Sequence, residues 1–170
     1  KRRFDDFMKQ EILKRDDSEH FYIYQNSNQI NTFTGIIGAA SIEDYLSNKI
    51  KKHEQTIKKR EEMFCNYIDT TGFNADPVLL THEPNENIKN ILKKYTESRS
   101  EYEFTTTNKS THKLWLVSNI LDIKNIINLF KDIKKIYIAD GHHRCASSAL
   151  LFKNKKSLLN SYFMSYLIDE

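Results

Sequence analysis

Glycine and proline are scarce in this sequence, at four and two of 170 residues, which excludes collagen-like chains and disorder rich in Gly and Pro. Two cysteines are too few for a disulfide-stabilised scaffold. No apolar run approaches the roughly 18–20 residues of a membrane-spanning helix, so we expect no membrane partner. The chain also lacks a strong excess of one charge sign, because 26 Lys and Arg against 23 Asp and Glu leave a net charge of +3. That balance does not by itself indicate a nucleic-acid partner.

The chain opens at Lys1 with neither an initiator methionine nor a signal peptide. We therefore expect a segment of a longer protein. Cys65 and Cys145 lie in helix-like contexts, and neither has a partner at metal-ligand spacing. These features predict two free, buried thiols in a reducing cytoplasm rather than a disulfide bridge or a zinc site.

Apolar spacing and turn residues predict a single α+β domain over residues 1–170, with a mixed, largely antiparallel sheet flanked by helices. A hairpin is expected from strands 21–24 and 31–40, where two glycines indicate close packing or a bulge. Ser41 and Asn119 are expected to cap helices. The other predicted elements are helices at 3–15, 54–68, 86–96 and from about 143, strands at 77–80 and 136–139, and a second hairpin of 102–106 with 114–117.

The most informative stretch is Asp140-Gly141-His142-His143-Arg144, between a predicted strand and a predicted helix. Gly141 permits a sharp turn, and the N-terminus of the helix favours an anion through its unpaired N–H groups and its dipole. Arg144 opposes that dipole unless an anion compensates it, and its fork suits phosphate or carboxylate. His142 and His143 can donate to phosphate oxygens, and Asp140 can orient one of them or hold a metal. We expect an anion site here, in preference to a purely structural turn or a metal site on two adjacent histidines.

The second candidate cluster is His53-Glu54, just before a predicted helix. Such a pair can supply a general base or a proton shuttle. Taken alone, it is better explained as a polar surface cap. His20, His82 and His112 stand singly near strand ends, and we expect structural roles for them.

At these two clusters the sequence resembles the domain of unknown function 1015 family of bacteria and archaea. The matching motifs occur in the same order and spacing along most of the chain, and Asp-Gly-His-His-Arg after a strand is a specific signature. The family usually has Arg at the position of Ile57 and an aromatic residue at that of Cys145. The matched motifs are Phe21–Tyr24, Thr34–Gly38, Ile50–Thr56, Asp76–Val78, His112–Trp115 and Tyr137–Arg144.

The strand, Gly-x-x-Arg and helix element is also similar to the phosphate-binding turn of the ParB/sulfiredoxin superfamily. There the Gly, the Arg and the helix N-terminus hold the phosphates of a nucleotide. Sulfiredoxin has a reactive Cys where this chain has His142, so the resemblance does not imply sulfinic-acid chemistry. Some relatives are kinases of free serine that use a Glu as general base, and others are nucleotide-gated DNA clamps.

These observations predict a nucleotide-dependent phosphotransferase that acts on a small hydroxylated metabolite, such as a free hydroxy amino acid. The expected cofactor is Mg²⁺ with ATP or ADP. Glu54 is assigned as the general base, with His53 beside it, and Asp140 as a ligand of Mg²⁺ or a partner of a histidine. The residues assigned to the phosphates are Gly141, His142, His143 and Arg144.

Two alternatives remain open. The chain could be a nucleotide-binding regulator without catalysis, with DNA as a partner as in the clamp relatives. A DNA reader should show an Arg-rich face, whereas the six Arg here are scattered, although 49–59 could form a Lys-rich phosphate-binding stripe. A hydrolase using His142 and Asp140 lacks a nucleophile, because Ser147 and Ser148 lie inside the predicted helix.

Overall fold

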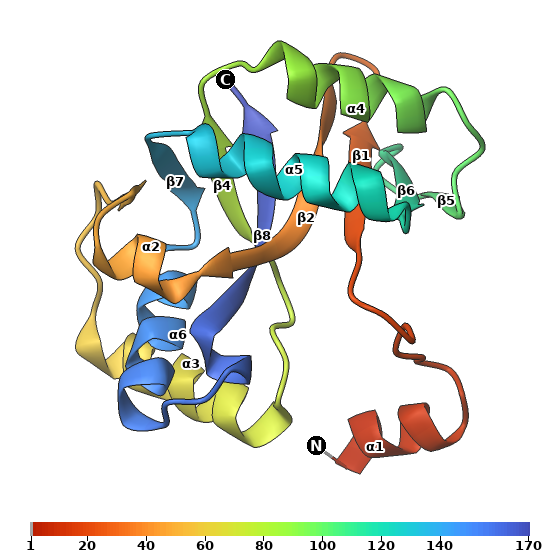
Figure 1. The fold of residues 1–170 in the computed structure, drawn as a ribbon. Coiled ribbons are helices and arrows are strands. Elements are labelled where there is room, and N and C mark those ends of the chain that lie inside the picture. The colour runs from red at the N-terminus through yellow and green to blue at the C-terminus, as the bar shows by residue number, and fades with distance from the viewer. Residues whose placement is uncertain (1) are drawn as a thin grey trace.

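The computed structural model describes residues 2–170, with side chains from Arg3 onward. Over that range the chain forms six α-helices, one short 3-10 helix (Leu159–Ser161) and eight strands in one mixed sheet (Figure 1). This confirms the predicted α+β class. Among the residues described, no helix is both long and apolar enough to cross a membrane. The helices are α1 (Arg2–Lys9), α2 (Ile42–Leu46), α3 (Lys58–Thr71), α4 (Glu86–Thr96), α5 (Ile120–Asp132) and α6 (His142–Asn154), and the strands are β1 (Phe21–Ser27), β2 (Thr32–Ser41), β3 (Ile50–Lys51), β4 (Val78–His82), β5 (Tyr102–Thr105), β6 (Thr111–Val117), β7 (Ile136–Asp140) and β8 (Tyr162–Asp169).

The sheet has the strand order β3-β7-β4-β8-β2-β1-β6-β5. β3 pairs with β7 and β4 with β8 in parallel, and the other neighbouring strands are antiparallel. The sheet is therefore mixed and largely antiparallel, as predicted. Both predicted hairpins form, β1 with β2 and β5 with β6.

One row of buried apolar side chains crosses neighbouring strands at matching register positions. Helices α4 and α5 cover one end of the row, where Ile88 and Ile126 pack against its members. Helix α6 covers the other end through Cys145. Helices α4 and α5 thus bury one part of the sheet and α6 buries another (Figure 1). From β6 to β7 the row consists of Trp115, Ile23, Ile36, Leu167, Leu80 and Ile138.

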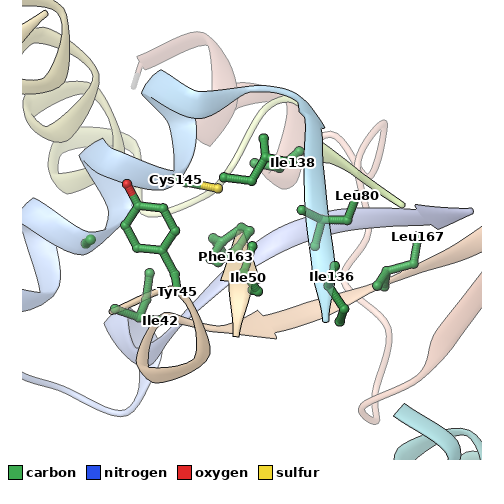
Figure 2. Close-up of a cluster of buried hydrophobic side chains, with 11 residues drawn as sticks. Ile42, Tyr45, Ile50, Leu80, Ile136, Ile138, Cys145, Phe163 and Leu167 are labelled. Atoms are coloured by element: carbon green, nitrogen blue, oxygen red, sulfur yellow. The ribbon is translucent and has the colours of Figure 1, made fainter. Parts of the chain in front are cut away.

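The part of the core beneath α6 also anchors the short elements near the candidate site (Figure 2). Phe163 of β8 is 1% exposed and belongs to the same cluster as Ile50 of β3 and Tyr45 of α2. Helix α2 and strand β3 are thereby tied to the sheet. Helix α3 packs along α6, whose buried face is built from small residues, including Ala146 and Ala149. Small side chains allow this close approach.

Both predicted helix caps are present. The Ser41 hydroxyl accepts hydrogen bonds from the backbone N–H groups of Glu43 (3.1 Å) and Asp44 (3.4 Å). The Asn119 side chain accepts from Leu121 (2.9 Å) and Asp122 (3.2 Å). Each cap satisfies N–H groups that have no partner inside the helix, which is why these residue types begin helices.

Two predicted helices have wrong boundaries. The helix expected at 3–15 ends at Lys9, where Glu11 adopts a positive φ of 57° and Ile12 stays 60% exposed. The helix would therefore gain no buried apolar contact at Ile12 if it continued. The helix expected at 54–68 begins only at Lys58, because the backbone of Ile57 is extended (φ −91°, ψ 118°); the Thr56 hydroxyl before it donates to Glu61 in the first turn. Its first four expected residues form a loop instead.

Strand β8 was not predicted, although it lies near the centre of the sheet between β4 and β2. Its side chains alternate, with Phe163, Ser165 and Leu167 buried. Ser165 interrupts the apolar pattern because its hydroxyl donates to the Gly38 carbonyl at 3.0 Å. Because this buried hydroxyl has a backbone partner, it costs the fold little stability. It nevertheless breaks the alternation of apolar residues from which a strand is predicted.

Gly35 and Gly38 provide the close packing that was predicted for the second strand. A Cβ at Gly35 would overlap the Leu167 carbonyl oxygen of β8, and one at Gly38 would lie 2.7 Å from the Phe21 ring. By contrast, a Cβ at Gly72 would meet nothing, although its φ of +79° disfavours a side chain.

We expect Gly35→Ala to lower the free energy of unfolding by about 1–3 kcal/mol, because backbone of a neighbouring strand must move. Gly72→Ala is the matched control and should cost about 1–2 kcal/mol from its φ alone. Urea unfolding followed by circular dichroism measures both. Equal stability of the Gly35 variant and the native chain would contradict the close approach of β2 to β8.

Candidate functional site

The candidate site starts where β7 passes directly into α6. Gly141 has a φ of 99°, a left-handed conformation that lets the chain leave the strand and begin the helix at His142. The first helical hydrogen bond runs from the Cys145 N–H to the Gly141 carbonyl at 3.1 Å. The helix has no side-chain cap and no acidic residue in its first turn. Its N-terminal N–H groups and its positive dipole end are therefore not compensated by a capping side chain.

The pairing of β3 with β7 brings the two sequence clusters together. Ile50 lies opposite Ile136 and Lys51 opposite Tyr137, with the strands parallel. Parallel strands end at the same edge of a sheet, so the loop after β3 meets the start of α6. The rings of His53 and His142 pack edge to face with centroids 4.4 Å apart.

Glu54 and His142 form a second contact between these clusters. The Glu54 Oε2 lies 3.4 Å from the His142 Nδ1. The side chain of His142 is only 4% exposed, whereas that of Glu54 is 59% exposed. Nδ1 is therefore the ring nitrogen of His142 that faces the carboxylate. Within the described part of the chain, the buried Nε2 of this ring has no hydrogen-bond partner.

The environment of His142 favours the neutral imidazole. Burial lowers the pKa of His142 below its ordinary value of 6.5, and the neighbouring His53 lowers it further. Glu54 and Asp140 act in the opposite direction and partly offset these effects. A neutral, buried imidazole beside a carboxylate is a group that can accept or pass on a proton.

Arg144 lies folded back over the turn. Its guanidinium donates to the Pro77 carbonyl at 2.9 Å and to the Asp140 carboxylate, and it lies 3.9 Å from the Asp76 carboxylate. A Cβ at Gly141 would lie 2.9 Å from the Arg144 Nε, so a side chain there would displace the guanidinium, and the φ of +99° disfavours one in any case. In the structure, Asp140 and Asp76 supply the negative charge that Arg144 needs at a helix N-terminus. Asp140 contacts Arg144, and Glu54 is the carboxylate that contacts His142.

The other polar groups on α6 differ in their surroundings. His143 Nδ1 and the Ser148 hydroxyl are buried and have no partner among the residues that the structure describes. The Ser147 hydroxyl donates to the His143 carbonyl at 2.6 Å. Burial raises the pKa of the Cys145 thiol to about 12, so this cysteine remains a protonated core residue. Both cysteines are free and buried, as predicted.

Of the single histidines, two take part in defined contacts within the fold. His82 is 1% exposed, its Nδ1 lies 2.8 Å from the Glu83 carbonyl, and its ring packs against Phe130. His112 Nδ1 lies 2.7 Å from the Tyr24 hydroxyl. Both contacts are far along the sheet from the start of α6 and are consistent with the structural roles that were expected.

A family model described as protein of unknown function, DUF1015, matches residues 1–170. The chain belongs to the DUF1015 family. Searches of curated proteins and of solved structures gave no match. Because the family description states no activity, the function of this DUF1015 chain has to be inferred from its site.

In this DUF1015 protein, the seven residues singled out from the sequence lie around the start of α6, on two segments of the chain. Sequence reasoning missed Asp76 and the Pro77 carbonyl, which hold the Arg144 side chain. An Asp immediately before the first residues of a predicted strand was the available signal. Nothing local connected it to a helix almost 70 residues later.

The pKa of His142 should respond in opposite directions to its two neighbours. We expect Glu54→Gln to lower it, because a compensating carboxylate is lost, and His53→Gln to raise it, because an imidazole that opposes protonation is lost. Titration of the histidine ring protons by NMR measures this, and Glu86→Gln, at an exposed position on α4, is the control.

The native pKa should lie below 6.5, so protonation favours the unfolded chain, and this group lowers the free energy of unfolding as the pH falls below about 6.5. An unchanged His142 pKa in both variants would contradict the geometry of this cluster.

Proposed function

We propose that the chain is a nucleotide-dependent phosphotransferase, with the phosphates at the start of α6 and the acceptor hydroxyl at Glu54. The observation that carries the proposal is the contact between an exposed carboxylate and a buried imidazole at an uncapped helix N-terminus, with Glu54 Oε2 3.4 Å from His142 Nδ1. A helix N-terminus favours phosphate, and a carboxylate within reach of solvent can accept a proton from a bound hydroxyl.

The phosphate subsite is supported by the donors at the start of α6. The backbone N–H groups of the first turn, the His143 ring and the Arg144 guanidinium belong to the same turn of helix. Arg144 already faces the carboxylates of Asp140 and Asp76. A phosphate would therefore have to share or displace these contacts, and the affinity for phosphate is set by that competition.

In the proposed reaction, the acceptor hydroxyl oxygen forms a bond to the terminal phosphorus of the nucleotide. The bond from that phosphorus to the bridging oxygen breaks, and its electron pair leaves with the shortened nucleotide. The hydroxyl proton goes to the Glu54 carboxylate. His142 holds this carboxylate in place through Nδ1, and the N-terminus of α6 with Arg144 stabilises the negative charge of the phosphates.

The residues beside the phosphate subsite also suit Mg²⁺, which prefers oxygen ligands and is commonly bound through one or two carboxylates together with phosphates. Asp140 and Asp76 have exposed carboxylates at this position, with side-chain exposures of 72% and 79%. Bound there with the nucleotide, Mg²⁺ would supply charge neutralisation.

Arg144→Ala should weaken the binding of Mg-ATP or Mg-ADP by roughly 10- to 100-fold, because charge-assisted hydrogen bonds contribute about 1.5–3 kcal/mol each. Isothermal titration calorimetry measures this. Arg99→Ala, which removes an exposed Arg after α4, should bind as the native chain does. Arg144→Lys tests the forked geometry while it keeps the charge. Unchanged nucleotide affinity in a folded Arg144→Ala variant would contradict the phosphate subsite.

Glu54→Gln should keep nucleotide affinity within about twofold and lower turnover by about 10²- to 10⁴-fold, the range for loss of a general base. Transfer from ATP or ADP to a panel of free hydroxy amino acids can be followed by ³¹P NMR. Glu62→Gln, an exposed Glu on α3, is the control. Native-like turnover in Glu54→Gln would remove Glu54 from the chemistry.

A nucleotide-binding regulator without catalysis is the second candidate, and the position of Arg144 favours it. A guanidinium held by Asp140 and the Pro77 carbonyl would have to rearrange when a phosphate binds, and such a rearrangement can carry a signal. Nucleotide binding without phosphoryl transfer in the native chain would support this candidate.

A further inference from the structure

A cavity of about 300 Å³ lies beside the start of α6. One wall is a side of α3 that carries Met63, Phe64 and Tyr67, and the rim carries the polar groups of Asn74 and Asp76. The volume is at the lower end of the range for small-molecule sites, which are concave, mostly apolar and provided with a few polar groups.

The side chains of this wall stay partly exposed, and the fold gives them few partners beyond the edge-to-face contact of Tyr67 with Phe73. α3 buries Cys65 against its neighbours, whereas Phe64, Tyr67 and Met63 are 36%, 43% and 56% exposed. The five residues before them on α3 are all charged. Two aromatic rings and a thioether gathered on the open side of an otherwise polar helix indicate a surface for an apolar or flat ligand.

Arg144 joins this cavity to the helix N-terminus. The same side chain lines the cavity and covers Gly141 at the first turn of α6. A ligand that extends from the cavity past Arg144 would therefore place a flat group against α3 and a charged group beside the first turn.

We propose that this cavity is the nucleoside subsite of the site above, with a nucleobase stacked on Phe64 and Tyr67 and the phosphates directed past Arg144. This assignment rests on the proposed function. It adds that the ligand carries a nucleobase, which free polyphosphate lacks. Stacking on aromatic rings tolerates any base, and the donors and acceptors of Asn74 can contact its edge.

The test compares ATP with inorganic tripolyphosphate by calorimetry. The native chain should bind ATP more tightly. Tyr67→Ala and Phe64→Ala should each reduce this advantage by roughly 5- to 140-fold, the range for loss of one stacking contact, and should leave the affinity for tripolyphosphate unchanged. Tyr67→Phe should retain the advantage, and Tyr102→Ala, at a 66% exposed Tyr on β5, should behave as the native chain.

A second readout does not depend on affinity. Tyr67→Trp places an indole in the cavity, where ATP should quench its fluorescence and tripolyphosphate should not. The only native tryptophan, Trp115, is 3% exposed and donates to the Ser98 carbonyl at 3.0 Å, so its emission should not change with either ligand.

The outcomes separate the two proposals. Tripolyphosphate binding that Arg144→Ala abolishes, with no advantage for ATP in the native chain, would overturn the nucleoside subsite and keep the phosphate site. An ATP advantage that survives both alanine variants would also overturn the nucleoside subsite. Failure of the native chain to bind either ligand would overturn both proposals.

Discussion

The parallel pairing of β3 with β7 is the constraint on which the candidate site depends. Only two residue pairs define it, Ile50 with Ile136 and Lys51 with Tyr137, and the Ile136 N–H adds a bond to the Lys49 carbonyl at 3.2 Å. Ile50 is 1% exposed and is packed in the core cluster of Phe163. The core therefore holds this edge strand more firmly than its few hydrogen bonds would, and the loop that carries His53 and Glu54 is fixed against α6.

Charge balance at the start of α6 follows from that arrangement. A cation in the first turn opposes the helix dipole, and the chain compensates Arg144 with carboxylates from the end of β7 and from the loop before β4. The partly offsetting effects on His142 have the same origin, because burial and His53 disfavour its charge while Glu54 and Asp140 favour it. The turn is thus rich in ionisable groups but has no isolated buried charge, which the fold could not tolerate without partners.

Local features were predictable from the sequence, and contacts distant along the chain were not. The caps at Ser41 and Asn119 and both hairpins depend on neighbouring residues, and they form as expected. β3 has only two residues, too few to show a period, and β8 contains the polar Ser165 on its buried side. The residue types of the site were therefore visible in the sequence, whereas the contact of Glu54 with His142 depended on a strand that no pattern reveals.

The packing of α3 on α6 sets the distance between Tyr67 and Arg144. The buried face of α6 is small, with Ala146 and Ala149 among its members, so α3 can lie close along it (Figure 1). Larger side chains on that face would push α3 outward and separate Tyr67 from Arg144, which line one cavity. The helix that carries Arg144 in its first turn thus also positions the aromatic wall, through its run of small residues directly after Arg144.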